Sequence, residues 1–589
     1  MKGTAERLPR TLLDNHVKTA KSTAAAVPPW FWLGLIILVA TLAAYWPVFS
    51  AGFIWDDDDY VTQNQALHDA DGLRQIWFTP AATPQYYPLV HTTFWVEYHL
   101  WGLDPLGFHL VNVLLHATGA ILLWRLLAGL KLPGAWLAAA VFALHPVQTE
   151  SVAWITELKN VLSAVFYFSA ALCYLRFAGL GEAAGDDRRR GRYYFAALFL
   201  FVAALLSKTV ACSLPAALAL VIWWKKDRLG WRDLLLLAPF FVLGAGLGLA
   251  TAWLEKNHVG AAGADWSLTF ADRGLIAGRA LCFYAANLLW PAHLAFIYPR
   301  WVVNARIWWQ WLFPAAVAAV VVGLWLARKQ VGKGPLVAVL FFCGTLLPAL
   351  GFVNVYPMRF SFVADHFQYL ASLGLIALAA GLAEYFFETV SWPGSRQLRL
   401  VLAGSLLCLL GVLTWCQCGS YRTPETLWRD TLARNPRSWM AHTNLGRLLA
   451  QRGEYAEAET HYLAALGSYP GEGSIHYNYA NLLARTDRPE AAIEQYREAL
   501  QIAPEKAQAH NNLGSVLNKL HRTDEAIAEY ERAIFYDPAY ADAYYNLGNA
   551  LSAEHKMYGA VAAFQRAARL KPDSDVFRKR LQALTAPAQ

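Results

Sequence analysis

The chain has few charged residues for its length, and this shortage argues against an ordinary soluble protein. Asp, Glu, Lys and Arg make up 16% of the 589 residues, whereas 56% are hydrophobic and the mean hydropathy is +0.28. In a typical soluble domain about a quarter of the residues are charged. The formal net charge is only +7, so nucleic acid is not an expected partner. The composition predicts an integral membrane protein.

Cysteine is scarce too, and its positions argue against a disulfide framework. Five of the seven cysteines fall inside apolar segments, where we interpret them as small packing residues. The other two, Cys416 and Cys418, offer a metal ion only two ligands, which is too few without further partners.

Three catalytic motifs are missing. The sequence has no Gly-x-x-x-x-Gly-Lys-Ser/Thr phosphate loop, no His-Glu-x-x-His zinc pair and no Gly-x-Ser-x-Gly elbow. These absences argue against an ATPase, a zinc metalloprotease and a serine hydrolase of the α/β type.

Long apolar segments fill the chain up to residue 418. A helix needs about 20 apolar residues to cross a bilayer, and the sequence predicts eleven such spans. They lie near residues 29–50, 106–130, 133–148, 159–177, 193–207, 209–225, 233–254, 308–327, 335–352, 367–388 and 398–416. The stretch 275–291 is also apolar, but Arg279 and Asn287 leave open whether it crosses, dips into the membrane or lies at its surface.

Basic residues between these segments predict the orientation, because loops rich in Lys and Arg face the cytoplasm. The basic positions are Lys131, Arg188, Arg189, Arg190, Arg192, Lys225, Lys226, Arg228, Arg232, Arg328, Lys329, Lys333, Arg396 and Arg399. All these basic residues lie on the cytoplasmic side if the N-terminal tail (1–28) is inside and residues 275–291 do not cross the membrane. The first loop (51–105) and the C-terminus then lie on the outer side. We expect a multi-pass protein of a cell inner membrane.

The C-terminal third carries a repeat. Prolines recur every 34 residues, a period typical of tetratricopeptide repeats (TPR); they are Pro436, Pro470, Pro504, Pro538 and Pro572. The sequence predicts four repeats over 437–572 and a capping helix over 573–589. A half-repeat connector (419–436), with Trp428 in the aromatic position of the repeat, joins them to the membrane domain (29–418). The predicted fold class is all-α, a polytopic membrane helix bundle followed by a TPR α-solenoid.

Each repeat has an asparagine at the same register, which predicts a row of amides along the solenoid. The four residues are Asn444, Asn478, Asn512 and Asn546. Amides offer donors and acceptors that suit an extended peptide backbone, so we expect an acceptor polypeptide, secreted or membrane-bound, to bind here. The alternative is that each asparagine only forms hydrogen bonds within the solenoid.

Four consecutive aspartates, Asp56, Asp57, Asp58 and Asp59, follow the first apolar segment. A carboxylate is costly at membrane depth, so this row is expected in water or in a polar cavity, as a base or as ligands of a divalent cation (Mg or Mn). Other polar residues lie where the predicted outer loops meet the spans. They are His145, Glu150, Lys159, Lys208, Arg359, Asp365 and His366.

Cations at membrane depth beside carboxylates suit transfer from a lipid-phosphate donor. The cations would hold the phosphate leaving group, and an aspartate would remove the proton of the acceptor hydroxyl. Each residue alone also has an ordinary interpretation, since a loop aspartate is usually solvated and a lysine near a helix end can reach the surface.

Several strings of residues resemble the transmembrane and tetratricopeptide-repeat O-mannosyltransferases and their bacterial relatives in the GT-C glycosyltransferase superfamily. The strings are Phe53-x-Trp55-Asp56-Asp57, His145-Pro146-x-x-Thr149-Glu150-x-Val152, Leu289-Trp290-Pro291-x-His293-Leu294 and Ala364-Asp365 with Tyr369-Leu370, followed by the repeats. The resemblance covers nearly the whole chain.

The resemblance implies a bundle of about a dozen membrane helices and inverting transfer of a sugar from a polyprenyl-phosphate carrier to a protein hydroxyl. It implies that Asp57 or Asp56 is the catalytic or acceptor-binding carboxylate, with Asp57 preferred. It also implies that Lys159, Lys208 and the residue after Asp365 approach the donor phosphate. Relatives often have arginine at this last position, where His366 stands here.

We therefore expect a membrane glycosyltransferase that acts on Ser or Thr of an exported protein presented by the repeats. Two alternatives are a non-enzymatic TPR scaffold for envelope or secretion complexes and a lipid-linked saccharide ligase or transporter. A mere anchor would not need Lys208 or the aspartate row at the membrane, and this distinguishes the scaffold from the enzyme.

Overall fold

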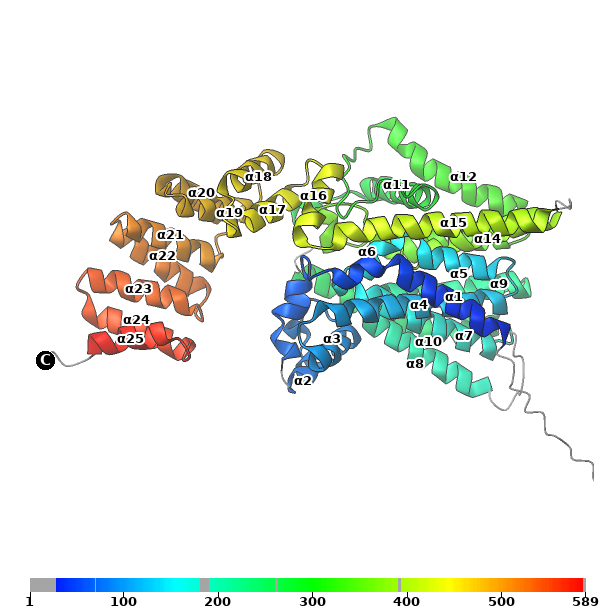
Figure 1. Cartoon of the computed structure of the whole chain (residues 1–589), viewed down its shortest axis with the longest axis horizontal. Coiled ribbons are helices and arrows are strands. Elements are labelled where there is room, and N and C mark those ends of the chain that lie inside the picture. The colour runs from blue at the N-terminus through cyan, green and yellow to red at the C-terminus, as the bar shows by residue number, and fades with distance from the viewer. Residues whose placement is uncertain (1–27, 69, 181–189, 260–262, 390–393, 586–589) are drawn as a thin grey trace, which may run out of the picture.

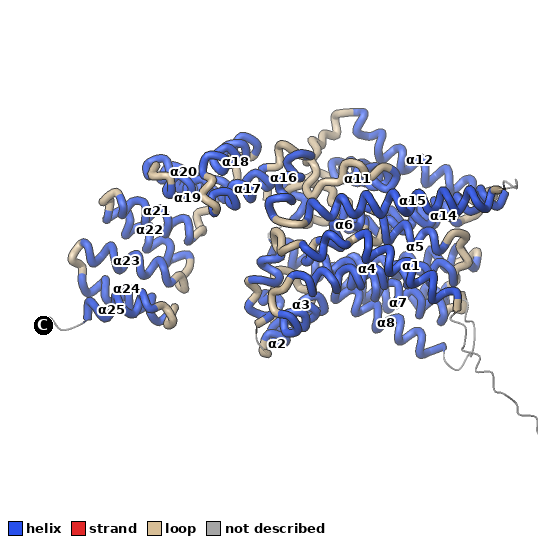
Figure 2. Tube along the Cα trace, viewed as in Figure 1, coloured by secondary structure: helices blue, strands red, loops and turns tan. Residues whose placement is uncertain are grey.

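The computed structural model describes residues 28–68, 70–180, 190–259, 263–389 and 394–585 (Figure 1). The predicted N-terminal tail up to residue 27, the basic residues Arg188 and Arg189, and the last four residues lie outside these ranges. The described residues form helices, short helical turns and loops, without a β-strand (Figure 2). The all-α fold with a membrane bundle and a C-terminal repeat solenoid, predicted from the sequence, is confirmed.

In the described part of the bundle, eleven α-helices overlap the eleven predicted spans. They are α1 (Pro29–Ala44), α4 (Pro105–Gly129), α5 (Ala135–Leu144), α7 (Leu158–Phe177), α8 (Arg190–Ser207), α9 (Leu214–Lys226), α10 (Trp231–Leu254), α12 (Leu312–Ala327), α13 (Gly334–Leu346), α14 (Ser372–Thr389) and α15 (Ser395–Cys418). In the described part of the chain, seven helices are long and apolar enough to cross a membrane, and three shorter ones are apolar. These helices are consistent with a multi-pass membrane protein.

Several helices stop earlier than the apolar pattern predicted. After α1 and α5 the chain continues as the 3₁₀ turns η1 (Trp46–Ser50) and η5 (Pro146–Gln148), each with a proline in its first turn. Proline lacks the N–H that the helix interior needs, so the α-helix ends before it. The predicted spans 29–50 and 133–148 therefore extend beyond the helices. Their last residues form turns at the end of the bundle that faces the repeats.

Helix α11 (Phe270–Leu289) contains the stretch whose crossing the sequence left open. Figure 1 shows it nearly end-on, at a large angle to α12 and α15. At its start, Arg273 donates to the Asn354 side chain, and at its end the Leu288 carbonyl contacts His145. Both partners lie in loops at the end of the bundle that faces the repeats, so α11 lies across that end.

The opposite end of the bundle collects the described basic loops. Lys225 donates to the Leu130 carbonyl, Lys226 pairs with Asp233 and Lys333 pairs with Asp227. The bundle thus has a basic end and a repeat end, as expected when positive loops share one side of a membrane.

The first loop is folded at the repeat end. It contains α2 (Gly72–Phe78), α3 (Pro88–Trp101) and a π-helical turn, Asp58–Thr62. Helix α3 packs against α8 and α4, so the loop is attached to the bundle beside the start of α7.

The solenoid follows α15 through α16 (Pro424–Arg434). Its helices are α17 (Trp439–Gln451), α18 (Tyr455–Ser468), α19 (Gly473–Arg485), α20 (Pro489–Ile502), α21 (Ala507–Lys519), α22 (Thr523–Tyr536), α23 (Ala541–Ala553), α24 (Met557–Leu570) and α25 (Asp575–Thr585). Three of the four repeats have glycine where their two helices meet, and the space there is small: a Cβ on Gly514 would lie 2.8 Å from the Tyr530 ring. The aromatic ring of the second helix occupies the space that the glycine leaves open.

The first repeats are docked on the membrane domain. Trp428 of α16 is 2% exposed and lies against Trp55 of the first loop. Arg359 forms an ion pair with Glu472, which begins α19, and a second one with Asp265. The solenoid then curves away from the bundle, with its last helices far from the membrane domain (Figure 1).

Candidate functional site

A polar cavity of about 500 Å³ lies between the membrane domain and the first repeats. Asp56, Asp59 and Lys159 line it on the membrane side, and Asn444 and Asn478 line it on the repeat side. Its walls also carry aromatic rings. The cavity therefore brings acidic groups of the first loop into one space with amides of the solenoid.

An apolar groove of about 770 Å³ lies on the outside of the bundle, along the repeat end of α10 and residues 347–355. Most of its lining is aliphatic or aromatic, but its inner end is polar and contains Asn160, Lys208 and His366. A groove with this lining suits a ligand that has a hydrocarbon chain and an anionic head.

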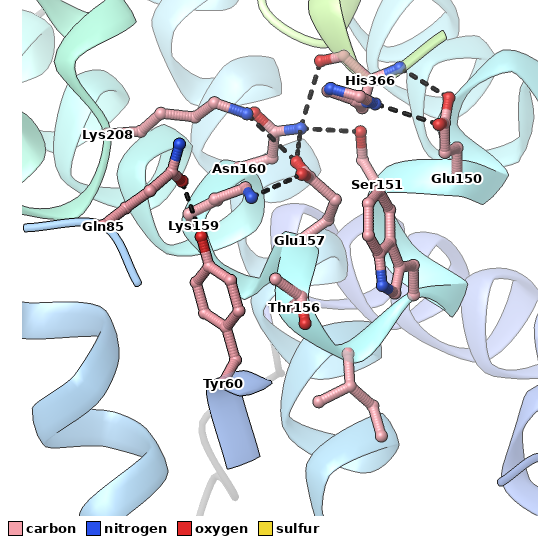
Figure 3. Close-up of polar contacts among 12 residues, drawn as sticks. Tyr60, Gln85, Glu150, Ser151, Thr156, Glu157, Lys159, Asn160, Lys208 and His366 are labelled. Carbon is pink, nitrogen blue, oxygen red and sulfur yellow. Dashed lines mark hydrogen bonds and ion pairs between the residues drawn. The ribbon is translucent and has the colours of Figure 1, made fainter. Parts of the chain in front are cut away.

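The two spaces meet at a cluster of charged residues. His366 lines both the polar cavity and the apolar groove. Lys159 Nζ lies 2.9 Å from Glu157 Oε1, and Lys208 Nζ lies 3.0 Å from Glu157 Oε2 (Figure 3). With two lysines on one glutamate, this cluster keeps one positive charge in excess, which suits the single negative charge of a phosphodiester.

The packing of two helices explains why these lysines meet. Helices α7 and α8 are antiparallel neighbours that pack closely against each other. Lys159 is the second residue of α7, and Lys208 directly follows the last residue of α8. Burial lowers the pKa of Lys208 to about 8, although Glu157 counteracts this shift.

Asp56 faces the polar cavity, and its Oδ1 is buried without a hydrogen-bond partner among the described residues. Burial raises the pKa of this carboxyl well above its ordinary value, while the nearby Lys159 ammonium lowers it. A carboxylate that is poorly solvated and has a free oxygen is a stronger base than one in water.

Asp57, the aspartate preferred from the sequence, points away from the cavity. Its Oδ1 accepts hydrogen bonds from the backbone and the side chain of Thr156, and its Oδ2 accepts one from the Ile54 N–H at 2.8 Å. The side chain is fully buried and absent from the lining of either cavity. Its hydrogen bonds fasten the first loop to the segment before α7, and of these two aspartates Asp56 is the one that lines the polar cavity.

The aspartate row does not converge on one point. Asp58 is exposed and accepts a hydrogen bond from Thr62, while Asp59 lies at the edge of the polar cavity. The described residues contain no group of three or more His, Cys, Asp or Glu side chains that could hold a metal ion. The divalent-cation site considered from the sequence therefore stays a prediction.

Glu150 orients His366. Glu150 Oε1 lies 2.9 Å from His366 Nδ1, and Glu150 Oε2 accepts the backbone N–H of His366, also at 2.9 Å (Figure 3). Because a carboxylate accepts hydrogen bonds, Nδ1 carries a proton and Nε2 is left for a ligand. Asn160 also donates to the His366 carbonyl and to Glu157, which ties the histidine to the lysine cluster.

Two residues predicted for the site lie outside both cavities. His145 begins the turn η5 and binds the Leu288 carbonyl, and burial lowers its pKa to about 4. Asp365 accepts a hydrogen bond from Tyr298, and burial raises its pKa well above the ordinary value. Both fasten loops at the repeat end. Arg359 does line the polar cavity, but its ion pairs join it to Glu472 and Asp265 rather than to the lysine cluster.

The four asparagines of the repeats divide into two pairs. Asn444 and Asn478 line the polar cavity. Asn512 donates to Asn481, and Asn546 donates to Asn511. The first pair faces the cavity, although Asn444 also donates to the Met440 carbonyl of its own helix, whereas the second pair forms hydrogen bonds within the solenoid, which is the alternative considered from the sequence.

Glu157, the carboxylate that holds both lysines, was not among the predicted site residues. The residue lies two positions before Lys159, but only the packing of α7 against α8 brings Lys208 to it. The predicted site also lacked the chain of hydrogen bonds from Tyr60 to Gln85 and from Gln85 to Glu255, which connects the first loop to the turn after α10; Tyr60 and Gln85 line the polar cavity and Glu255 lines the apolar groove. No local pattern marks these residues, because they lie far apart in the sequence.

The fold and these cavities define an α-helical protein with apolar membrane-type helices and a TPR solenoid. Residues 488–520 and 516–553 match the family model described as TPR repeat, and residues 419–473 and 541–574 match models described as tetratricopeptide repeat.

Over more of its length the chain is similar to proteins named protein O-mannosyl-transferase. It is 26% identical to TMTC4 of Mus musculus over 500 residues, which cover 72% of this chain and 65% of that protein. It is 32% identical to TMTC3 of Homo sapiens over 155 residues, covering 25% of this chain and 17% of that protein. The predicted resemblance to these O-mannosyltransferases is confirmed. The chain spans less than two thirds of the length of these curated relatives.

Among solved structures, the chain is similar to YrrB, titled a TPR protein with an unusual peptide-binding site. The identity is 20%, the match covers 27% of this chain and 81% of that chain, and the TM-score is 0.24.

Proposed function

We propose that this protein is a membrane glycosyltransferase that moves a sugar from a polyprenyl-phosphate carrier to a Ser or Thr hydroxyl of an exported polypeptide. One observation carries the proposal: His366 lines both the apolar groove and the polar cavity. A donor in the groove and an acceptor in the cavity would meet there. The names of the relatives suggest a mannosyl group as the sugar.

The apolar groove supports a lipid-linked donor. Its aliphatic wall along α10 would hold the polyprenyl chain, and its polar end would hold the phosphate through the Lys208 ammonium, with the His366 ring beside it. Lys159 contacts the same glutamate as Lys208, so it adds positive charge on the cavity side. Cations aimed at a leaving phosphate stabilise the charge that it gains.

The polar cavity supports a polypeptide acceptor. The amides of Asn444 and Asn478 would bind its backbone, and Asp56 lies on the opposite wall. In the reaction, the acceptor hydroxyl gives its proton to Asp56 while its oxygen forms a bond to the anomeric carbon of the sugar. The bond from that carbon to the phosphate oxygen breaks, and the phosphate leaves with the electron pair. A single displacement of this kind inverts the anomeric centre.

The basic end of the bundle supports an orientation with the repeats on the outer side of a cell inner membrane. Labelling would test this in a variant without native cysteines, with one cysteine at Asn512 or Asp227. An impermeant maleimide applied to intact spheroplasts should label position 512 and spare position 227 until the membrane is opened. Labelling of position 227 but not of position 512 would show that the orientation is the opposite one.

Mass spectrometry of outer-side proteins tests the function itself. Cells with the wild-type chain should carry hexose on Ser or Thr of at least one exported protein, and cells without the chain or with Asp56→Asn should lack it. The variant Asp58→Asn is the matched control, because Asp58 is exposed and lines neither cavity. Unchanged hexose in cells without the chain would refute the proposal.

A further inference from the structure

The residue before the proposed base has an unusual backbone. Trp55 has φ of 45°, a conformation that bulky residues rarely adopt. It is the second residue of a turn closed by the Asp57 N–H, which donates to the Ile54 carbonyl at 3.0 Å. Asp56, the third residue, is not in the positive-φ region. Turns with a positive φ at the second residue usually have glycine there.

This turn sets the directions of the two aspartates that follow. It brings the Asp57 carboxylate back to the Ile54 N–H and towards Thr156. Asp56 is left on the other side, where it lines the polar cavity. With a negative φ at Trp55 the turn would be of another type, and its peptide planes and the Asp56 side chain would point in other directions.

The Trp55 side chain is held by rings from four other segments. Trp154 stacks on it at 5.3 Å, and three further rings lie around it with centroids at 5.3, 6.3 and 6.3 Å; these are Phe296, Phe360 and Trp428. Trp428 belongs to α16, the half-repeat of the solenoid, and also packs against Phe296 at 5.8 Å. Packing of this kind stabilises a backbone conformation that is unfavourable by itself.

We infer that Trp55 and Trp428 are positioning residues that hold Asp56 in the polar cavity, so that the docked half-repeat is a structural part of the site. The inference rests on the proposed function. It assigns the solenoid a role beyond binding the acceptor: undocking of α16 would release the Trp55 turn and withdraw the base.

Two substitutions of Trp55 distinguish the effect of the turn conformation from the effect of the indole ring. Trp55→Ala and Trp55→Gly both remove the indole, but only glycine adopts the positive φ without strain. If the turn matters, the glycine variant should transfer sugar about five-fold faster or more than the alanine variant, which is the size of a left-handed penalty. If Trp55 only fills space, the larger alanine side chain should do at least as well as glycine, and that order would overturn the inference.

Substitution of Trp428 tests the half-repeat. Trp428→Ala should lower kcat while KM for the donor stays within about two-fold, because the lysine cluster is not touched, and Trp428→Phe should restore most of kcat. In a Trp55→Gly background, Trp428→Ala should cost much less than in the wild type, since glycine needs no ring to hold the turn. Equal cost in both backgrounds would contradict the coupling.

Phe564→Ala is the control for lost packing. Phe564 occupies the same aromatic position in the last repeat and does not contact Trp55. The Phe564→Ala substitution should leave kcat unchanged. If Trp428→Ala fails to fold, the relative transfer rates of Trp55→Gly and Trp55→Ala still test the inference. A wild-type chain without transferase activity would refute the proposed function, whereas an active wild type with equal Trp55→Gly and Trp55→Ala would refute only this inference.

Discussion

Glu150 holds His366 by two hydrogen bonds, one to the ring and one to the backbone, each 2.9 Å long. The glutamate comes from α6 (Thr149–Ala153) and the histidine from the turn before α14, so the contact joins segments that are 216 residues apart. It fixes which ring nitrogen faces the place where the two cavities meet.

Weakening this contact should slow transfer. In Glu150→Gln the amide can accept only one of the two hydrogen bonds, so we expect kcat to fall about ten-fold, the value of one ordinary hydrogen bond. His366→Ala should cost more, and Glu150→Gln should add little to it, because the glutamate acts through the histidine. Purified variants assayed with labelled donor would show this, and fully additive losses would contradict it.

Arginine at position 366 should preserve activity. The resemblance to the O-mannosyltransferases implies arginine at this place in many relatives, and a guanidinium is always charged and offers several donors to a phosphate. We expect His366→Arg to keep kcat within about ten-fold of the wild type and His366→Ala to lose more. Equal losses would show that the charge at this position does not act on the donor.

Substitutions of Asp56 and Asp57 should have different effects, the first on transfer and the second on stability. Asp56→Asn removes the base, so transfer should be lost while thermal unfolding is unchanged. Asp57→Asn turns an N–H donor towards the donors of Thr156 or Ile54, which should destabilise the fold by about 1–3 kcal/mol. Loss of activity at Asp57 with full thermal stability, and normal activity at Asp56, would reverse the two roles.

The pH profile of transfer should be bell-shaped. On the acid side, protonation of Asp56 removes the base, and its raised pKa moves this limb above the ordinary aspartate range. On the alkaline side, Lys208 has a pKa of about 8, is charged below that pH and loses its charge above it. Lys208→Arg should shift only the alkaline limb to higher pH, because arginine stays protonated. An alkaline limb that does not move would assign it to another group.

The architecture could be predicted from the sequence because local patterns of residues determine the helices and the repeats. The 34-residue proline period and the paired glycine and aromatic positions, such as Gly514 and Tyr530, follow directly from helix packing within one repeat. The long apolar segments likewise predicted the helices of the bundle, apart from their ends, where Pro47 and Pro146 start 3₁₀ turns.

The site was only partly predictable. Lys159 and Lys208 were chosen because a lysine is costly near a membrane, and the structure brings them together. The choice between Asp56 and Asp57 depends on the backbone of Trp55, and a positive φ at tryptophan has no signal in sequence propensity. The positions of His145 and Asp365 outside the cavities depend on contacts with distant segments.

We propose that Asp56 and the lysine cluster act together on one acceptor and one lipid-phosphate donor. The most direct measurement is transfer by the purified full chain in lipid nanodiscs, with a radiolabelled polyprenyl-phosphate sugar and exported proteins from cells that lack the chain. Label should appear on Ser or Thr with the wild type and disappear with Asp56→Asn. Equal labelling by the wild type and Asp56→Asn, or none with either, would contradict it.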